Sequence, residues 1–205
     1  MKKPKIREIK EAVTALLKGP YTVPFPYVSH KPFPGFRGAA KYFEEDCVGC
    51  GACAMVCPTG TIEMEDIVDK EKGTGKRILT LYYKNCEFCA FCEECCITGK
   101  GVRLTQEFDL STFNKESVFT RVEKELALCE ICGEVVTAWD HLKWLGEKLG
   151  PLAYTNPGVI ASTHLDIEEI KEKTPRGELK WRFDQMRVLC PKHRREVYRI
   201  EERPK

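Results

Sequence analysis

The sequence predicts an α+β protein in three parts, and three observations support this. A run of cysteines in the middle of the chain is repeated once, segments typical of short strands or turns surround the two runs, and an amphipathic helical pattern lies outside them on either side. These patterns predict a helix and arm at 1–40, a cysteine-rich domain at 41–108 and an extension at 109–205.

The first part begins with apolar residues at helical spacing up to about residue 17, lysine and arginine on the other face, and Gly19-Pro20 as a stop signal. The following segment, YTVPFPYVSHKPFPGFRG, alternates prolines with aromatic residues, which favours an extended arm without a core of its own. The arm is expected to lie on another surface. The helix either packs on its own protein or docks on a partner subunit or a membrane-proximal surface.

The second part contains the pattern CxxCxxCxxxC twice, from Cys47 to Cys57 and from Cys86 to Cys96. Thiolate is the soft ligand that iron–sulfur clusters select, and this run is the bacterial signature of a [4Fe–4S] cluster, so two copies predict two clusters. In two-cluster proteins the fourth cysteine of each run ligates the other cluster. The expected ligands are therefore Cys47, Cys50, Cys53 and Cys96 for cluster 1, and Cys86, Cys89, Cys92 and Cys57 for cluster 2. Zinc or structural thiols are the alternative.

Two details depart from the ideal repeat. Pro58 follows the first run as expected, but Ile97 stands in that place after the second. Cys95 is surplus, and it is either a buried packing thiol or an alternative fourth ligand at a shortened spacing. Gly49 and Gly51 would let the backbone approach the cluster sulfides, where amide donors tune the potential.

The segments around the two runs read as short strands or turns. TGTIEMEDI (59–67) and RILTLYYKN (77–85) are joined by a loop at 72–75, and GVRLTQEFDL (101–110) is expected to be the closing strand. Together they predict the small pseudo-symmetric β/α unit of a two-cluster bacterial ferredoxin-like domain.

The third part carries CEIC and, much later, CPKH. Three thiolates and one imidazole complete a tetrahedral set that suits zinc, and such a closed site is structural. The sequence therefore predicts a C-terminal zinc-binding module with one Zn²⁺, against the alternatives of another metal, a cluster or no metal. The expected ligands are Cys129, Cys132, Cys190 and His193.

A helix with Thr137 as its N-cap is predicted between the two halves of this set, with an apolar face that packs in the core, before Gly150-Pro151. The other histidines are expected to be ordinary polar residues, namely His30, His141 and His164.

Charge and hydropathy restrict the class of protein. The net charge of +2 gives no case for nucleic acid as a partner, and metallation would change it to about −3. No apolar run reaches the roughly 20 residues of a membrane-spanning helix, and without an apparent leader the cysteines are expected in a reducing compartment. No catalytic arrangement of side chains is recognised. Fully ligated clusters pass electrons one at a time, so the expected role is electron transfer.

These residues resemble a known family. The segment FRGAAKYFEEDCVGCGACAMVCPTGTI, with the second cysteine run, is similar to the two-cluster, TYKY-type subunit shared by respiratory complex I and the membrane-bound [NiFe] hydrogenases, over about residues 20–108. The tail, with LALCEICGE and LCPKHRRE, looks like the cysteine-rich extension of the iron–sulfur subunit of formate hydrogenlyase-type complexes, although that extension has two CxxC pairs.

The resemblance implies a non-catalytic subunit that relays electrons from an oxidising module, for formate, carbon monoxide or ferredoxin, to the hydrogenase small subunit. The implied partners are the hydrogenase small and large subunits, membrane-arm subunits and an upstream donor. The implied location is peripheral, on the cytoplasmic side of the cell membrane, with the N-terminal helix near the membrane-embedded subunits. The alternatives are a subunit of another complex I relative that reduces quinone or sulfur, a free ferredoxin, and an interaction protein that uses its metals only for architecture.

Overall fold

The computed structural model describes residues 5–156, 159–160 and 187–199. The chain divides into two compact units, Met1–Phe36 and Arg37–Lys205, and each is described by itself.

The first unit contains helix α1 (Ile6–Lys18), which confirms the helix predicted from the apolar spacing. Glu8 stabilises its first turn, because the Glu8 carboxylate accepts a hydrogen bond of 2.9 Å from the Lys5 backbone N–H. None of the helix residues is buried, and Ile6, Leu16 and Leu17 are each more than 80% exposed. The expected contact of this apolar face with another surface stays a prediction.

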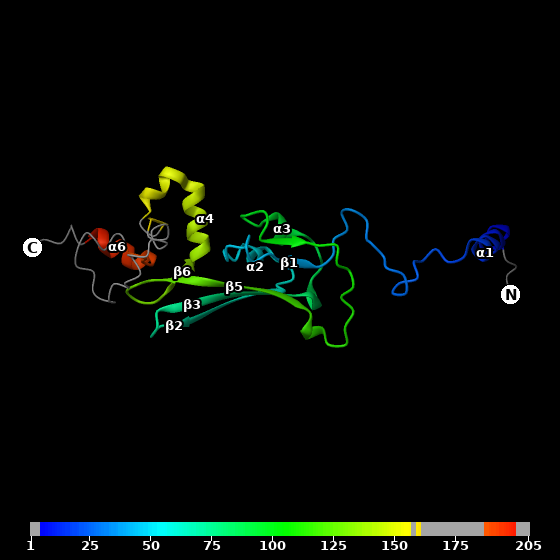
Figure 1. Ribbon diagram of the computed structural model, residues 1–205, viewed down its shortest axis with the longest axis horizontal. Coiled ribbons are helices and arrows are strands. Elements are labelled where there is room, and N and C mark those ends of the chain that lie inside the picture. The colour runs from blue at the N-terminus through cyan, green and yellow to red at the C-terminus, as the bar shows by residue number, and fades with distance from the viewer. Residues whose placement is uncertain (1–4, 157–158, 161–186, 200–205) are drawn as a thin grey trace, which may run out of the picture. The chain divides into compact units, whose positions relative to one another are not determined.

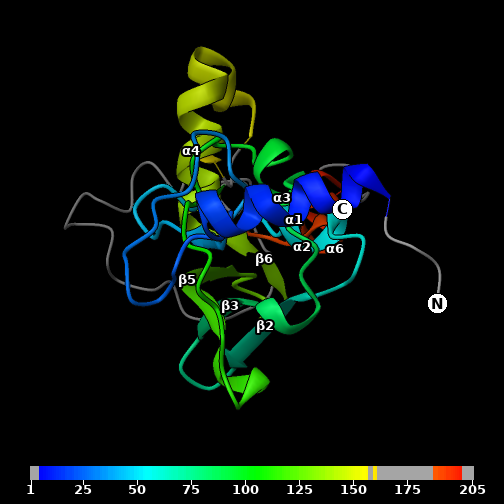
Figure 2. The same ribbon diagram turned by 90° about the vertical axis from the view of Figure 1, so that its right-hand side faces the viewer.

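The second unit is built on an antiparallel four-stranded sheet in the order β2-β3-β5-β6 (Figure 1). Its strands are β2 (Ile62–Asp69), β3 (Thr74–Tyr82), β5 (Phe119–Leu128) and β6 (Val135–Ala138). A two-stranded sheet pairs β1 (Ala40–Tyr42) with β4 (Val102–Leu104), and the short helices α2 (Ala52–Val56) and α3 (Phe91–Glu94) follow the cysteine loops (Figure 2). The mixed helix and sheet class is as expected.

The hairpin of β2 and β3 confirms the strands predicted on either side of the loop at 72–75, with Ile62 opposite Leu81. Short 3-10 turns, η1 (Tyr83–Asn85) and η2 (Lys115–Ser117), flank the connection to β5. Strand β5 then pairs with β3 from Lys76↔Glu125 to Tyr82↔Phe119. The sheet therefore continues across residue 108, and the domain boundaries at 40 and 108 stay predictions.

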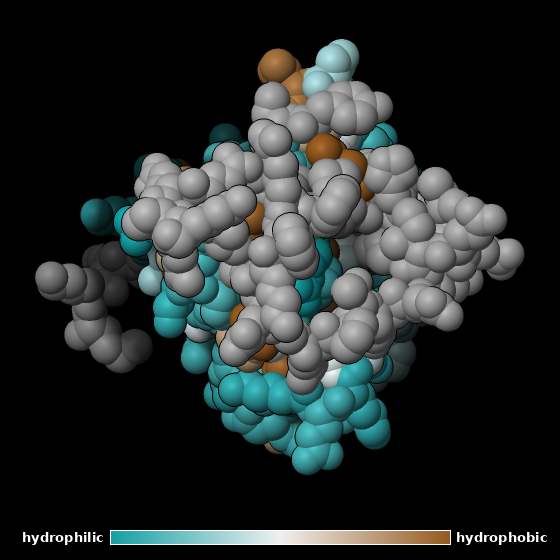
Figure 3. All heavy atoms as spheres, turned by 90° about the vertical axis from the view of Figure 1, so that its left-hand side faces the viewer, coloured by the Kyte–Doolittle hydropathy of each residue, from teal (hydrophilic) through white to brown (hydrophobic). Residues whose placement is uncertain are grey.

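The main core lies where the sheet meets the cysteine loops. Leu79 and Leu81 of β3 are each 1% exposed, and they pack with Val102, Val122 and the buried thiols of Cys47 and Cys53, with partly buried cysteines of both runs beside them. Burying a leucine side chain contributes about 1.5–3 kcal/mol, so the apolar residues that stabilise the fold also hold the cysteine loops. Hydrophilic side chains gather instead where the turn between β2 and β3 lies, on the lower part of the face shown in Figure 3.

The rest of the second unit comprises α4 (Trp139–Leu149), the 3-10 turn η3 (Gly150–Thr155) and α6 (Pro191–Arg199). Helix α4 confirms the predicted helix and buries Leu142 against Ala127 of β5. The predicted cap is wrong: Ala138 is the N-cap, because Thr137 belongs to β6 and its hydroxyl lies 2.9 Å from His141 Nδ1. His164 lies outside the described residues.

In the described part of the chain, every helix is too short or too polar to cross a membrane.

Candidate functional site: two cysteine cavities and a Cys/His group

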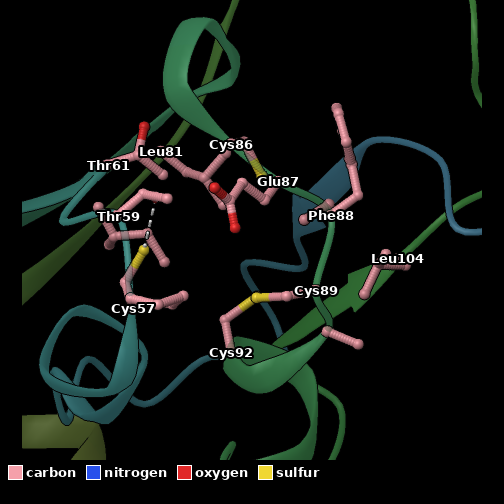
Figure 4. A pocket seen from close by; sticks show the side chains of 14 residues that line it. Cys57, Thr59, Thr61, Leu81, Cys86, Glu87, Phe88, Cys89, Cys92 and Leu104 are labelled. Carbon is pink, nitrogen blue, oxygen red and sulfur yellow. Dashed lines mark hydrogen bonds between the residues drawn. The ribbon is translucent and has the colours of Figure 1, made fainter.

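The two cysteine runs line two neighbouring cavities, and each cavity takes cysteines from both runs. Site 1 is lined by the first three cysteines of the first run and the last of the second, namely Cys47, Cys50, Cys53 and Cys96. Site 2 is lined by Cys57, Cys86, Cys89 and Cys92 (Figure 4). These are the two groups that the crossed-ligand rule predicts from spacing. Their role as ligands remains a proposal.

The backbone follows the sequence repeat closely around both sites. Each cysteine of the second run lies 39 positions after its counterpart in the first. Gly49 and Gly51 have positive φ angles of 66° and 81°, and their counterparts Phe88 and Ala90 have 52° and 74° although neither is glycine. The second loop thus adopts the same left-handed geometry at a cost in strain of about 1–2 kcal/mol per residue.

The last cysteine of each run receives matching hydrogen bonds. Burial opposes ionisation of Cys57, but the Thr59 hydroxyl and nearby backbone amides hold its pKa below the ordinary value. At Cys96 the Thr98 hydroxyl and neighbouring amides likewise outweigh burial and lower the pKa. The hydroxyl oxygens lie 3.6 Å from Cys57 Sγ and 3.3 Å from Cys96 Sγ. Both positions therefore favour the thiolate that a metal cluster needs.

The third cysteines of the two runs behave in the opposite way. Burial raises the pKa of Cys53 to about 11 despite a hydrogen bond from Tyr42. Burial and then the charge of Cys53 raise the pKa of Cys92 to about 12. Since Cys53 lines site 1 and Cys92 lines site 2, the two sites are electrostatic neighbours. Buried groups of like charge in this position require a compensating cation, which cluster iron would supply.

A buried arginine supports the first cysteine loop. Arg77 of β3 is 8% exposed and donates to both carboxylate oxygens of Asp66 at 2.8 Å. Its remaining nitrogen, Nη1, donates to the Gly49 carbonyl at 3.0 Å. This bond ties the loop of site 1 to the sheet, while the carboxylate balances the buried charge.

The two departures from the ideal repeat have distinct outcomes. Ile97 lines site 1 just as Pro58 lines site 2, so the isoleucine takes the place of the missing proline. The expectation that Cys95 is a buried packing thiol is wrong, because Cys95 is exposed. It follows directly after α3 as the C-cap residue and lines neither cavity.

Away from the cavities, the structure brings together all four residues predicted as zinc ligands, Cys129, Cys132, Cys190 and His193. Their ligand atoms all lie within 4.8 Å of one another. His193 Nδ1 lies 3.5 Å from Cys129 Sγ and 3.4 Å from Cys190 Sγ, and the Sγ atoms of Cys132 and Cys190 are 3.9 Å apart. Zn–S bonds of about 2.3 Å and Zn–N bonds of about 2.0 Å at tetrahedral angles give ligand separations of about 3.5–3.8 Å. The three separations given above are close to these values.

Two remote chain segments are fixed together at this group. The Glu130 carboxylate accepts hydrogen bonds from the Val188 amide at 2.9 Å and from Arg187 Nε at 2.8 Å, and the Glu130 amide donates to the Val188 carbonyl. The Cys129 thiol is buried, yet amides of Cys132, Cys190 and Ile131 and the ring of His193 lower its pKa to about 7. The expected zinc module has its residues in place, and zinc itself stays a proposal.

Sequence reasoning missed the side chains that contact or face the sulfur atoms, namely Tyr42, Thr59, Thr98 and Glu87. A signal existed for the threonines, because Thr59 and Thr98 are also separated by the repeat offset of 39 residues. Tyr42 gave no comparable signal, since its hydroxyl lies 3.5 Å from Cys53 Sγ only after β1 pairs with β4.

Comparisons with known proteins identify an iron–sulfur domain and a family. Residues 40–63 match the model of the 4Fe-4S binding domain family. NADH-quinone oxidoreductase subunit I 1 of Symbiobacterium thermophilum is 37% identical over 119 residues, which cover 53% of this chain and 74% of the relative. NAD(P)H-quinone oxidoreductase subunit I of Prochlorococcus marinus is 32% identical over 172 residues, covering 81% and 76%.

Among solved structures, a chain in the structure of the membrane-bound sulfane sulfur reductase, described as an archaeal respiratory membrane complex, is 27% identical, with a TM-score of 0.38 and coverage of 57% of this chain and 61% of that one. The two quinone oxidoreductase subunits share more than 30% of their residues with this protein over about three quarters of their own length. On this similarity, and with a match to the 4Fe-4S binding domain at its first cysteine run, the chain belongs to the family of NADH-quinone oxidoreductase subunit I.

Proposed function

We propose that the chain is the electron-transfer subunit of a complex I-related oxidoreductase and passes electrons through two [4Fe–4S] clusters. Cys47, Cys50, Cys53 and Cys96 would hold cluster 1, and Cys57, Cys86, Cys89 and Cys92 would hold cluster 2. The observation that carries the proposal is the crossed lining of the two cavities, with four cysteines around each.

The residues around the cavities suit this role. All four ligand positions of each cluster are filled by thiolates, so no coordination position is open for substrate, and one-electron transfer is the chemistry that remains. The apolar side chains of Leu79, Leu81 and Val102 exclude water beside the cysteines. The protein's contribution is therefore to hold two clusters close together in a dry environment and to set their potentials with hydrogen bonds and charges.

Anaerobic iron and sulfide analysis of the full chain, with low-temperature EPR, tests this proposal. We expect about eight iron and eight sulfide per chain, and a reduced spectrum with two magnetically interacting [4Fe–4S]⁺ centres. Four iron or fewer per chain, in protein never exposed to air, would refute the proposed two-cluster relay.

The relatives favour the quinone-reducing alternative over the hydrogenase expected from the sequence resemblance, since both curated relatives described above are named as quinone oxidoreductase subunits. We propose partner subunits on both sides of the relay, an upstream electron donor and a downstream acceptor module. Purification through a tag on this chain should recover these subunits. Hydrogen production by the purified complex would support the hydrogenase function. Quinone reduction without hydrogen production would support the quinone-reducing function.

Peripheral attachment at the cytoplasmic side of the membrane is part of the same proposal, and the exposed apolar face of α1 supports it. Deletion of residues 1–18 should release the chain from the membrane fraction while both clusters remain. Retention of the shortened chain on the membrane would assign the attachment to other residues.

We also propose that Cys129, Cys132, Cys190 and His193 bind one structural zinc ion. Support comes from the four ligand atoms, which all lie within 4.8 Å of one another, and from the Glu196 carboxylate, which lies 4.0 Å from the other ring nitrogen of His193. Zinc would join the turn after β5 to the start of α6. A water ligand has no position, so the ion would contribute folding energy instead of catalysis.

Metal analysis separates this site from the clusters. The wild-type chain should carry one zinc besides its iron, and Cys190→Ala should lose the zinc while it keeps about eight iron. Cys95→Ala is the matched control, because Cys95 is an exposed thiol outside all three groups, and it should keep both metals. Iron in place of zinc at the Cys/His group would show that the site binds iron. Equal metal content in Cys190→Ala and wild type would refute the proposed metal site.

A further inference from the structure

The main-chain amides around the two cluster sites match, but the side chains do not. Backbone hydrogen bonds reach the first cysteines from Gly49 and from its counterpart Phe88, and the third cysteines from Ala54 and from its counterpart Glu93. Because these donors follow the repeat, they shift both cluster potentials similarly. The larger differences that the structure shows between the two sites are in their side chains.

Site 1 has an additional hydroxyl donor. Tyr42 of β1 places its hydroxyl 3.5 Å from Cys53 Sγ, and its counterpart at the repeat offset of 39 residues, Leu81 of β3, lines site 2 with an apolar side chain. A cysteine that ligates iron is a thiolate and has no proton to donate, so the tyrosine must donate. A hydrogen bond to cluster sulfur offsets negative charge, and reduction adds negative charge, so this bond favours the reduced cluster.

The threonine donors also favour site 1. The Thr98 hydroxyl oxygen accepts hydrogen bonds from the amides of Gly101 at 3.0 Å and Lys100 at 3.3 Å, which directs its own proton towards Cys96. At site 2, Thr59 Oγ1 lies 3.6 Å from Cys57 Sγ, and within the described residues this hydroxyl makes no other hydrogen bond. The hydroxyl at site 1 therefore lies closer to its cysteine sulfur than the hydroxyl at site 2 and is better oriented.

A carboxylate lines site 2, whereas the residues that line site 1 include no acidic side chain, and Asp46 beside Cys47 is paired with Arg103 at 3.8 Å. Glu87 follows Cys86 and lines the site 2 cavity, as Figure 4 shows, whereas the counterpart position after Cys47 is Val48. A carboxylate beside the cluster disfavours the extra electron. Cations lie near both sites, so they do not set the order: Arg77 and Lys124 near site 1 are paired with Asp66 and with Asp140 at 2.9 Å, and Arg37 at site 2 donates to the Cys89 carbonyl at 3.4 Å.

From this asymmetry we infer that site 1 holds the cluster of higher potential and site 2 the cluster of lower potential, so that electrons move within the chain from site 2 to site 1. Tyr42 and Glu87 are the positioning residues for this order, through their effect on the clusters. The transfer moves one electron and breaks no bond, and an upstream one-electron donor supplies the electron at site 2. The inference rests on the proposed two-cluster function.

Redox titration of the full-length chain, followed by EPR, tests the order. Tyr42→Phe should lower the upper of the two midpoint potentials by about 40–60 mV. For a one-electron couple this is a five- to tenfold change in the ratio of reduced to oxidised cluster at a given potential. Glu87→Gln should raise the lower midpoint by a similar amount. Each substitution alone thus narrows the interval between the two midpoints.

Tyr83→Phe is the matched control, because the Tyr83 hydroxyl donates to the Ala40 carbonyl at 2.6 Å instead of to sulfur, and it should shift neither midpoint. A shift of the lower midpoint by Tyr42→Phe, of the upper by Glu87→Gln, or no shift by either would overturn the order. The iron and sulfide content of each variant is measured beside the titration. A wild-type chain without two clusters would refute the proposed function, whereas eight iron with the wrong shifts would refute only this inference.

Discussion

Replacing Arg77 with methionine should destabilise the chain by about 2–3 kcal/mol. The substitution removes two hydrogen bonds to Asp66 and one to the Gly49 carbonyl, and leaves the carboxylate without its partner. Breaking a fully buried pair costs about 3–5 kcal/mol. The Asp66 side chain is 25% exposed, so water replaces part of the lost interaction. The expected cost is therefore smaller than for a fully buried pair, about 2–3 kcal/mol.

Thermal unfolding of the full chain with its clusters, recorded anaerobically at one fixed scan rate, measures this effect. For a chain of this size 1 kcal/mol corresponds to about 2–4 °C, so the midpoint should fall by about 4–12 °C. Iron should leave site 1 before site 2, because the lost bond held the Gly49 loop.

The control is Lys76→Met, the same change at the neighbouring position of β3. Lys76 is 69% exposed and lies 3.5 Å from Glu123, so its loss should cost about 0.5 kcal/mol or less. The double variant Arg77→Met with Asp66→Leu should recover much of the lost stability, because no unpaired carboxylate remains. Equal midpoints for Arg77→Met and Lys76→Met would refute the argument from burial.

Three further predictions follow from the loops and the Cys/His group. Ala90→Gly should slow the release of iron to a chelator, and Gly51→Ala should accelerate it. Both positions have positive φ, where a Cβ costs about 1–2 kcal/mol. Changes of the release rate in the same direction would contradict this reason. Removal of zinc should increase amide hydrogen exchange in α6 by tenfold or more and leave β3 protected, and a uniform increase would show that the ion stabilises the whole unit. Cys95→Ser should leave both cluster EPR signals unchanged, and loss of either would make this exposed thiol a ligand.

The sequence predicts much of the cluster region because its information there is local. Cysteine spacing determines which thiols share a loop, and the two-cluster rule then assigns Cys57 and Cys96 to the opposite sites. The cavities in the structure have this grouping. The hairpin of β2 and β3 is also local, since one short loop connects two apolar segments.

What the sequence does not predict depends on contacts between remote segments. Strand β5 pairs with β3 although 36 residues separate the end of one from the start of the other, and nothing near either strand indicates this partner. The orientation of Cys95 also depends on the end of α3, and the position of the Tyr42 hydroxyl depends on the pairing of β1 with β4. The cap at Thr137 failed because β6 runs directly into α4, so its threonine is a strand residue.

The most direct test of the two-cluster arrangement compares the EPR spectra of four single variants of the full chain, prepared and reduced without air. If the ligands cross, Cys57→Ala and Cys86→Ala lose the same cluster and leave one common spectrum, and Cys96→Ala and Cys47→Ala leave the other. We expect this grouping, because each cavity is lined by cysteines of both runs. A Cys57→Ala spectrum that matches Cys47→Ala would show that each run ligates its own cluster, and would contradict it.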